Sequence, residues 1–262
     1  MKVLVTGANG YLCSFLIPGL ESVESYEVFR ATRKNFSSDL IEHFQPDIVI
    51  NTVNAYCEYS KKNADIYESN LLFGTRLLQY LESTNKEVSV INCSTALPKN
   101  YNIYAFSKRQ FEEFARNFRP RNINFINLRM QSFYGANLHE NLISYVIERC
   151  RLDETVLLSA GGQEREYTYI DDVIDAIIAV TRQSASLKEY LNIDVGSGSS
   201  FSVQHVARTI KEIMGSKSDL QFGQVFTPQI AVPRSNLKIL KSLGWREKYT
   251  LKTGLKKTIG DF

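Results

Sequence analysis

Residues 3–13 read VLVTGANGYLC, and this stretch decides the fold. It begins with an apolar run typical of a buried strand, passes through a turn that contains Gly7 and Gly10, and ends in an apolar segment typical of a helix. Glycines let the backbone turn tightly and approach a pyrophosphate, and a helix start offers N–H groups and the positive end of its dipole. A strand, a glycine-rich turn and a helix in this order predict a dinucleotide-binding site.

The rest of the first half alternates short apolar runs with amphipathic segments. We expect strands over residues 2–6, 27–31, 47–52, 88–94 and 124–129, and helices over residues 10–23, 39–44, 64–83 and 104–118. Short Val/Ile/Leu runs separated by helices are typical of a parallel sheet that is covered on both faces. The sequence therefore predicts an α/β fold with a Rossmann-type doubly wound parallel sheet.

In the second half the predicted elements are shorter and less regular. We expect helices over residues 141–150, 172–182 and 201–214, the last capped by Ser202, and strands over residues 156–159 and 190–194. This change predicts a dinucleotide-binding Rossmann domain over residues 1–135 and a smaller α/β substrate-binding lobe over residues 136–262. Within that second span we expect the chain to return to the sheet.

Composition excludes several classes of protein. The 262 residues carry 31 basic and 28 acidic side chains, and a net charge of +3 is too small to indicate nucleic acid or an anionic membrane as partner. The chain starts directly with a strand-like run and has no uninterrupted apolar stretch of membrane-spanning length, so we expect a cytoplasmic protein without a signal peptide. The cysteines are irregularly spaced and predict buried thiols in a reducing compartment, not a metal site: Cys13, Cys57, Cys93 and Cys150.

Residues 6–12, TGANGYL, resemble the TGxxGxxG fingerprint of the extended short-chain dehydrogenase/reductase family, in the form found in its NAD(P)-dependent nucleotide-sugar enzymes. Cys13 stands where that family usually has a third glycine, which serves close packing of helix on strand. The resemblance implies that the cofactor contacts residues of this turn and of the third strand end: Thr6, Gly7, Asn9, Gly10, Tyr11, Leu12, Asn51 and Thr52.

The end of the second predicted strand bears on the choice of cofactor. Residues 30–34 read RATRK and contain no carboxylate that could accept hydrogen bonds from the adenosine ribose. An arginine in this place can pair with a 2′-phosphate. We therefore expect Arg33 and Lys34 to favour NADP, with NAD as the less favoured cofactor.

Residues 104–108, YAFSK, are the one YxxxK segment in the chain. They place a phenol and an ammonium four residues apart, on one face of a helix. A nearby Lys⁺ favours the phenolate and so brings the proton transfer of a phenol, with a usual pKa of about 10, closer to neutral pH. The family keeps its catalytic pair in this place, so the resemblance implies that Tyr104 is the acid and that Lys108 also holds the nicotinamide ribose.

The third member of the family's catalytic set is a Ser or Thr just past the fourth strand. The candidates here are Ser94 and Thr95, and the family pattern favours Thr95. Eight residues separate Thr95 from Tyr104, fewer than in most of the family, so the resemblance implies a trimmed loop at the rim of the site.

Segments of the second half resemble the sugar-nucleotide end of the same family: LRMQSFYG at 128–135, QEREYTYIDDV at 163–173, LNIDVGSG at 191–198, and a closing LGW…GL pattern. The resemblance implies that Arg165 and Arg234 bind the diphosphate of a nucleotide sugar, because arginine offers forked donors to phosphate. By position, His139 and Asn141 line the sugar pocket. The resemblance also implies a homodimer formed through the predicted helices 64–83 and 104–118.

The residues after Thr95 bear on the reaction. Dehydratases of this family carry Asp-Glu there and decarboxylases carry a Glu, whereas this chain has Ala96 and Leu97. Two reactions remain: NADPH-dependent reduction of a 4-keto sugar, which Arg33 favours, and NAD-dependent epimerisation. A non-catalytic NADP-binding protein and a reductase of a non-sugar carbonyl are further alternatives. The intact Tyr104 and Lys108 pair argues against the first of these, and Arg165 and Arg234 argue against the second.

Overall fold

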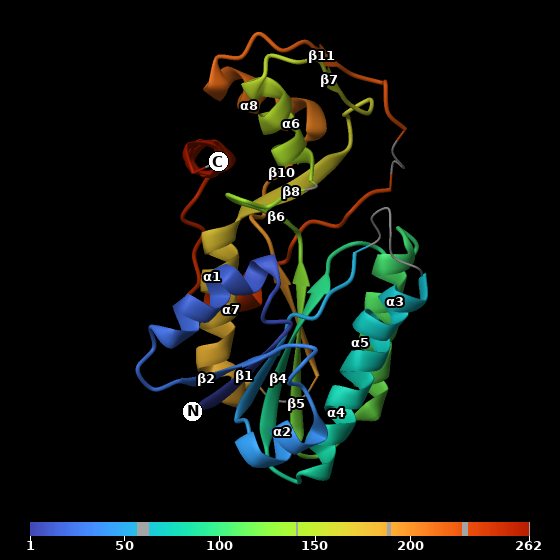
Figure 1. Cartoon of the computed structure of the whole chain (residues 1–262), viewed down its shortest axis with the longest axis vertical. Helices are drawn as coiled ribbons and strands as arrows, with labels where there is room; N and C mark the ends of the chain where they lie inside the picture. Colours follow the sequence, from blue (N-terminus) through green and yellow to red (C-terminus); the bar gives the residue numbers. More distant parts are fainter. Residues whose placement is uncertain (57–62, 140, 188–189, 227–229, 262) are drawn as a thin grey trace. The chain divides into compact units, whose positions relative to one another are not determined.

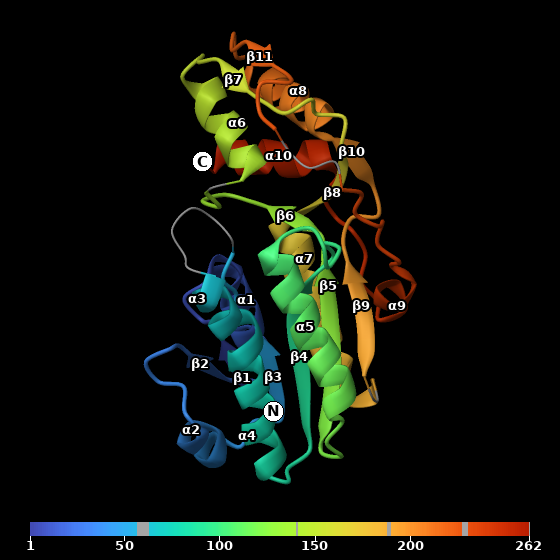
Figure 2. The same ribbon diagram turned by 90° about the vertical axis from the view of Figure 1, so that its right-hand side faces the viewer.

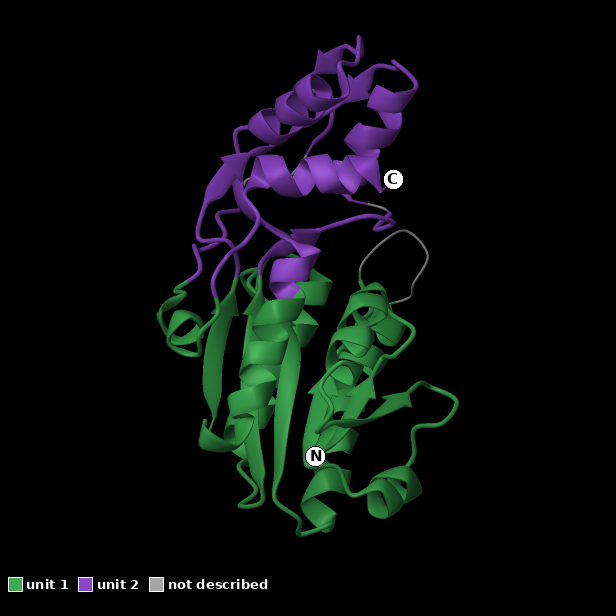
Figure 3. Cartoon of the chain, turned by 90° about the vertical axis from the view of Figure 1, so that its left-hand side faces the viewer, with its two compact units in different colours: residues 1–130, 174–195, 236–245 green, residues 131–173, 196–235, 246–262 purple. Residues whose placement is uncertain are grey.

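The structure is a computed structural model that describes residues 1–56, 63–139, 141–187, 190–226 and 230–261. The chain divides into two compact units, coloured separately in Figure 3. Unit 1 comprises residues 1–130, 174–195 and 236–245, and unit 2 comprises residues 131–173, 196–235 and 246–262.

Unit 1 is built on a six-stranded sheet in the order β2-β1-β3-β4-β5-β9, with every neighbouring pair parallel. Its strands are β1 (Lys2–Thr6), β2 (Glu27–Ala31), β3 (Ile48–Asn51), β4 (Val88–Thr95), β5 (Ile123–Met130) and β9 (Leu191–Val195). All eight residues of the central strand β4 are buried, although four of them are polar: Ser89, Asn92, Ser94 and Thr95. The predicted α/β fold with a doubly wound parallel sheet is confirmed.

Helices cover both faces of this sheet: α1 (Tyr11–Glu21), α2 (Ser38–Phe44), α3 (Asn63–Tyr67), η1 (Glu68–Leu72), α4 (Phe73–Ser83), α5 (Ile103–Phe118), the later part of α7 (Ile170–Gln183), η2 (Ser184–Ser186) and α9 (Lys238–Ser242). In Figure 1, α1 and α7 lie on one face and α4 and α5 on the other. Two glycines allow this close packing. A Cβ at Gly19 of α1 would lie 2.9 Å from Ile178, and one at Gly74 of α4 would lie 2.6 Å from an edge atom of Phe111.

The helix expected over residues 64–83 is not one regular α-helix. It consists of α3, the π-helical turn η1 and α4 in direct succession. The consequence of the π-helical turn is local: Asn70 of η1 accepts a hydrogen bond from the N–H of Ala55 and donates to the Ser107 hydroxyl of α5.

Unit 2 contains a three-stranded sheet in the order β10-β8-β6 and a two-stranded sheet of β11 and β7. Its elements are β6 (Ser132–Tyr134), α6 (Leu142–Arg151), β7 (Val156–Leu157), β8 (Glu164–Tyr169), β10 (Ser200–Ser202), α8 (Val203–Met214), β11 (Leu220–Gln221) and α10 (Leu251–Gly260). Ser202 caps α8 as predicted, since its hydroxyl accepts from the N–H of His205. The helix begins at Val203 and not at Phe201, because residues 200–202 pair with β8.

Figure 2 shows α6, α8 and α10 grouped around these small sheets of unit 2. The strand β8 was not predicted, because its charged and aromatic residues alternate without a clear apolar face. It is nevertheless the centre of the three-stranded sheet, and four of its six residues are buried.

Within the described ranges, no group of three or more His, Cys, Asp or Glu side chains could hold a metal ion. No helix of the described part of the chain combines the length and the apolar character needed to cross a membrane. Cys13, Cys93 and Cys150 are buried free thiols, and Cys57 lies outside the described residues.

Candidate active site

The glycine-rich turn lies at the point where the order of strands reverses. β1 has β2 on one side and β3 on the other, and open α/β sheets bind ligands outside the carboxyl ends of strands at such a switch point. Gly7 has φ +74°, and a Cβ there would lie 2.8 Å from the Thr52 hydroxyl and 3.0 Å from the Val53 nitrogen. Only glycine therefore fits between the ends of β1 and β3.

Helix α1 starts directly after this turn. Gly10, which has no side chain, is the N-cap, and its N–H donates to the Gly7 carbonyl at 2.9 Å. Cys13, in place of the family's third glycine, is buried, and its sulfur lies 3.1 Å from the Thr52 hydroxyl. A small side chain is thus accommodated there by contact with the end of β3. A turn that excludes Cβ atoms and leads into a helix N-terminus fits the pyrophosphate of NAD(P).

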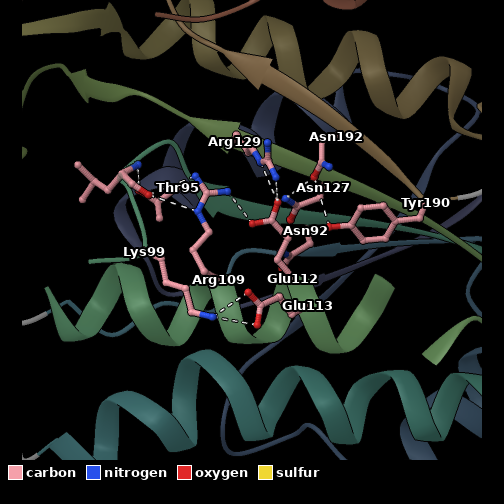
Figure 4. A network of polar contacts seen from close by, with 11 residues as sticks. Asn92, Thr95, Lys99, Arg109, Glu112, Glu113, Asn127, Arg129, Tyr190 and Asn192 are labelled. Carbon is pink, nitrogen blue, oxygen red and sulfur yellow. Dashed lines mark hydrogen bonds and ion pairs between the residues drawn. The ribbon is translucent and has the colours of Figure 1, made fainter. Parts of the chain in front are cut away.

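A row of hydrogen-bonded side chains crosses the sheet just below these strand ends. Its members lie in register on five neighbouring strands, and three of them are drawn in Figure 4: Thr6, Asn51, Asn92, Asn127 and Asn192. Each side chain donates to the amide oxygen of the next, at 2.8 to 3.0 Å. The side chains of Thr6 and Asn51, predicted to contact the cofactor, are thus used within the sheet.

The turn after β2 carries the predicted specificity residues. Arg33 is exposed, and its Nη2 donates to the hydroxyl of Ser69 in η1 at 3.2 Å. Lys34 is also exposed, and its N–H donates to the Thr32 hydroxyl. The Arg33 side chain reaches Ser69 of η1, and no such contact with another described residue is seen for the side chain of Lys34. Arg33 is therefore better placed than Lys34 to bind a 2′-phosphate.

Tyr104 and Thr95 lie together at the end of β4 and the start of α5. The Thr95 hydroxyl lies near enough to the Tyr104 phenol to influence its pKa, and Tyr104 is buried, with the ring of Tyr56 at 4.7 Å between centroids. Burial raises the pKa of Tyr104 far above its usual range, while the Thr95 hydroxyl and, more weakly, the Arg109 charge act in the opposite direction. The charge of Lys108 alone predicted a lowered pKa for Tyr104. Burial, which the sequence does not show, has the larger effect.

Lys108 lies one helical turn after Tyr104 on the buried face of α5. Its Nζ donates to the main-chain carbonyls of Val53 at 2.9 Å and Cys93 at 3.1 Å, so it connects the ends of β3 and β4. Burial lowers its pKa to about 8. The ammonium is still mainly charged at pH 7 and remains able to bind a polar group of a ligand.

Ser94 and Thr95 are both buried, but they differ in their contacts. Successive side chains of a strand point to opposite faces, so only one of the two can face Tyr104. That one is Thr95. The Ser94 hydroxyl makes no hydrogen bond to any residue that the structure describes. The geometry therefore favours Thr95 over Ser94 as the partner of Tyr104.

Arg165 and Arg234, expected to bind a diphosphate, come together inside unit 2. Nη1 of Arg165 donates to the carbonyl of Glu164, and Nη2 of Arg234 lies 3.5 Å from the carboxylate of the same Glu164. The buried Glu166 brings them together, since its carboxylate accepts from the N–H of Ser235 at 2.6 Å. The side chain of Arg234 is 66% exposed and therefore accessible to an anion.

The two residues suggested for the sugar pocket have different surroundings. Asn141 is the N-cap of α6, where its side-chain oxygen accepts from the N–H groups of Ile143 and Ser144. This capping role explains its position, and the predicted sugar contact has no support in the structure. His139 is exposed, and its Nδ1 lies 3.7 Å from the carboxylate of Glu148.

Comparison with known proteins assigns the family. The profile of the NAD dependent epimerase/dehydratase family matches residues 3–196. The chain belongs to this family. It is therefore an NAD(P)-dependent enzyme of the short-chain dehydrogenase/reductase type, as the sequence predicted.

Relatives within the epimerase/dehydratase family match over nearly the whole length. A CDP-abequose synthase of Salmonella muenchen is 25% identical over 98% of this chain and 97% of its own length. A GDP-6-deoxy-D-talose 4-dehydrogenase of Aggregatibacter actinomycetemcomitans is 23% identical over 95% of this chain and 94% of its own. The fold is similar to that of a UDP-glucuronic acid 4-epimerase from Bacillus cereus, solved with UDP-glucuronic acid and NAD. The TM-score is 0.88, the identity is 18%, and the match covers 100% of this chain and 98% of that chain.

The sequence did not predict a role for two residues that follow Tyr104 and Lys108 on α5. Arg109 follows Lys108 directly, and its guanidinium binds the carbonyl of Leu97 in the loop after β4. Glu112 is a buried carboxylate that binds Arg109. Glu112 could have been noticed in the sequence, because it follows Lys108 by four positions on the apolar face of an amphipathic helix. A charge on that face needs a partner.

Proposed function

We propose that this protein uses NADPH to reduce the 4-keto group of a sugar linked to a nucleoside diphosphate. The observation that carries this proposal is the buried pair of hydroxyl groups of Thr95 and Tyr104, in the same unit as the glycine-rich turn. A carbonyl oxygen that gains negative charge needs donors of this kind, one of which can release its proton.

Each residue of the pair has a role in this reaction. The hydroxyls of Thr95 and Tyr104 bind the carbonyl oxygen, and Tyr104 donates its proton as the alcohol forms. Burial raises the pKa of Tyr104, so the phenol is protonated at neutral pH and carries the proton that the forming alkoxide takes up. Lys108, held by the carbonyls of Val53 and Cys93, binds the nicotinamide ribose. NADPH, when bound, supplies the hydride.

Three observations favour a nucleotide-linked sugar as the substrate and reduction as the reaction. Two relatives that match nearly the whole chain are named for a CDP-sugar and for a GDP-6-deoxy sugar, and the second name specifies position 4. Arg165 and Arg234 offer the forked donors that a diphosphate requires. Ala96 and Leu97 lack the carboxylates that dehydration would need.

An isotope experiment tests the reaction class. We expect incubation with [4-²H]NADPH, labelled on the transferred face, and a panel of nucleotide-linked 4-keto sugars to place deuterium at C4 of the product. One deuterium should appear for each NADP⁺ formed, as determined by NMR and absorbance at the NADPH band. A protein that purifies with NAD and interconverts two 4-hydroxy sugars without added NADPH would instead be an epimerase.

Arg33 should decide cofactor preference. We expect NADPH to bind at least about tenfold more tightly than NADH, because one arginine–phosphate interaction is worth about 1.5–3 kcal/mol. Arg33→Ala should remove most of that difference by weakening NADPH binding alone. Isothermal titration calorimetry with both cofactors measures it.

Arg30→Ala is the matched control for this prediction. Arg30 lies on β2, three residues before Arg33, and pairs with Glu21 at 2.7 Å on the surface. Its removal should leave the ratio of the two dissociation constants unchanged. Equal affinity of the wild type for NADPH and NADH would contradict the assignment of Arg33.

A further inference from the structure

The loop between β4 and α5 is held at Leu97 from both sides. The N–H of Leu97 donates to Oγ1 of Thr95 at 3.1 Å. The carbonyl of Leu97 accepts from Nε and Nη2 of Arg109, at 3.3 and 3.2 Å. The main chain two residues after Thr95 is therefore fastened both to the Thr95 side chain and to α5.

The guanidinium that holds Leu97 is itself fixed. Its Nη1 donates to Oε2 of the buried Glu112 at 2.6 Å, one turn further along α5. The other carboxylate oxygen of Glu112 accepts from Nε of Arg129 on β5 at 2.7 Å, and from Nη2 of the same residue. Figure 4 shows Arg109 pointing from α5 toward the Thr95 loop, with Glu112 between Arg109 and Arg129.

These contacts determine the direction of the Thr95 hydroxyl. Its oxygen accepts a hydrogen bond from the N–H of Leu97, so its own proton can be directed to another acceptor, and the Tyr104 phenol lies nearby. If Leu97 moved away, Oγ1 of Thr95 would no longer accept a hydrogen bond from its N–H, and the Thr95 side chain could rotate about χ1. The orientation of Thr95 thus depends on where Leu97 is held.

We propose that Arg109 is a positioning residue for the reaction proposed above. Arg109 fastens the short Thr95–Tyr104 loop through Leu97 and so keeps the Thr95 hydroxyl directed at the reacting oxygen. The proposal rests on the proposed function only in assigning Thr95 to the reacting oxygen. The fastening itself is independent of the substrate. The seven residues between β4 and α5 form no helix or strand, and side chains of α5 hold them in place.

A second contact from α5 reaches the same loop and makes a comparison possible. Lys99 pairs with Glu113 at 2.7 Å, but both side chains are about half exposed, and an exposed pair contributes little. Arg109 differs because its acceptor is a main-chain carbonyl and its counterion is buried. Its charge also acts on Tyr104, whose pKa it lowers.

Hydrogen exchange of the wild type and three variants tests the fastening without any substrate. In Arg109→Met we expect the amides of residues 96–101, apart from Pro98, which has no N–H, to exchange about tenfold faster, the effect of losing one charge-assisted hydrogen bond. Arg109→Lys keeps the charge but has one nitrogen in place of the three that contact Leu97 and Glu112, so it should give a smaller increase. Arg116→Met, which removes an exposed arginine two turns further along the same helix, should leave the loop unchanged.

A double-mutant cycle tests the link to Thr95. We expect Arg109→Met to lower kcat on the order of 10- to 100-fold, since small misplacement of a reacting group has effects of this size, with the Kd for NADPH unchanged. In a Thr95→Ala background the same substitution should have almost no further effect on kcat, because the residue that it positions is gone.

Each result decides for or against the proposal. Unchanged exchange of residues 96–101 in Arg109→Met would overturn it, and so would equal losses of kcat in the two backgrounds. Faster exchange along all of α5 would show that Arg109 merely supports the helix. If the protein is an epimerase, the double-mutant cycle is measured with kcat of the epimerase reaction, and the hydrogen-exchange result does not change. Failure of the proposed function is therefore distinguishable from failure of this inference.

Discussion

Tyr104→Phe is expected to lower turnover by about 10²- to 10⁴-fold, the usual contribution of a positioned general acid, and to leave the Kd for NADPH nearly unchanged. The substitution removes one oxygen, which is the proton donor in the proposed reaction. The ring remains, so its packing against Tyr56 and the buried face of α5 is kept. Steady-state kinetics with a 4-keto sugar and fluorescence titration with NADPH measure the two effects.

Tyr80→Phe is the control for the loss of a phenol. Tyr80 lies on α4, also in unit 1, where its ring packs near Phe36. The same chemical change there should leave turnover unchanged. If Tyr104→Phe kept a third of wild-type turnover, the proton would come from another group and the proposed roles would be wrong.

Lys108→Met should impair both cofactor binding and turnover. The ammonium is buried, and two main-chain carbonyls leave it one N–H for a ligand. Loss of a charged hydrogen bond worth about 1.5–3 kcal/mol corresponds to a Kd for NADPH that is on the order of 10- to 100-fold higher. Turnover should fall as well, because Val53 and Cys93 at the ends of β3 and β4 are no longer connected.

The same variant should remove a pH dependence of stability. Lys108 has a pKa of about 8 in the folded protein, below the usual 10.5. Below pH 8 the folded protein holds a buried charge, which costs free energy. Between pH 8 and 10 the unfolded chain keeps a proton that the folded protein has released, so the free energy of unfolding rises with pH. This rise, about 2 kcal/mol relative to Lys108→Met, is measured by urea unfolding at each pH.

Lys86→Met serves as the control for both measurements. Lys86 also donates to a main-chain carbonyl, that of Gln45, but it is partly exposed and pairs with Asp47. Its loss should change neither cofactor affinity nor the slope of stability between pH 8 and 10. A Lys108→Met protein with wild-type affinity for NADPH would refute the role of Lys108 in binding.

The sequence by itself determined the features that depend on local pattern. The strand, glycine turn and helix of residues 3–13 are dictated by the order of apolar residues and by Gly7, whose φ of +74° favours glycine. Tyr104 and Lys108 could be placed on one helix face because residues four apart always are. The inner strands of the first half could be predicted because a parallel sheet buries both of their faces.

Tertiary structure alone decided the features that depend on burial and on distant partners. The pKa of Tyr104 is raised and not lowered, because desolvation outweighs nearby charge, and burial cannot be calculated from spacing. The choice of Thr95 over Ser94 required the direction in which β4 presents each side chain. Arg109 binds Leu97, and Glu112 binds Arg129, across 12 and 17 positions of the chain. Contacts at such separations form only when β4, α5 and β5 pack together, and no local pattern encodes them.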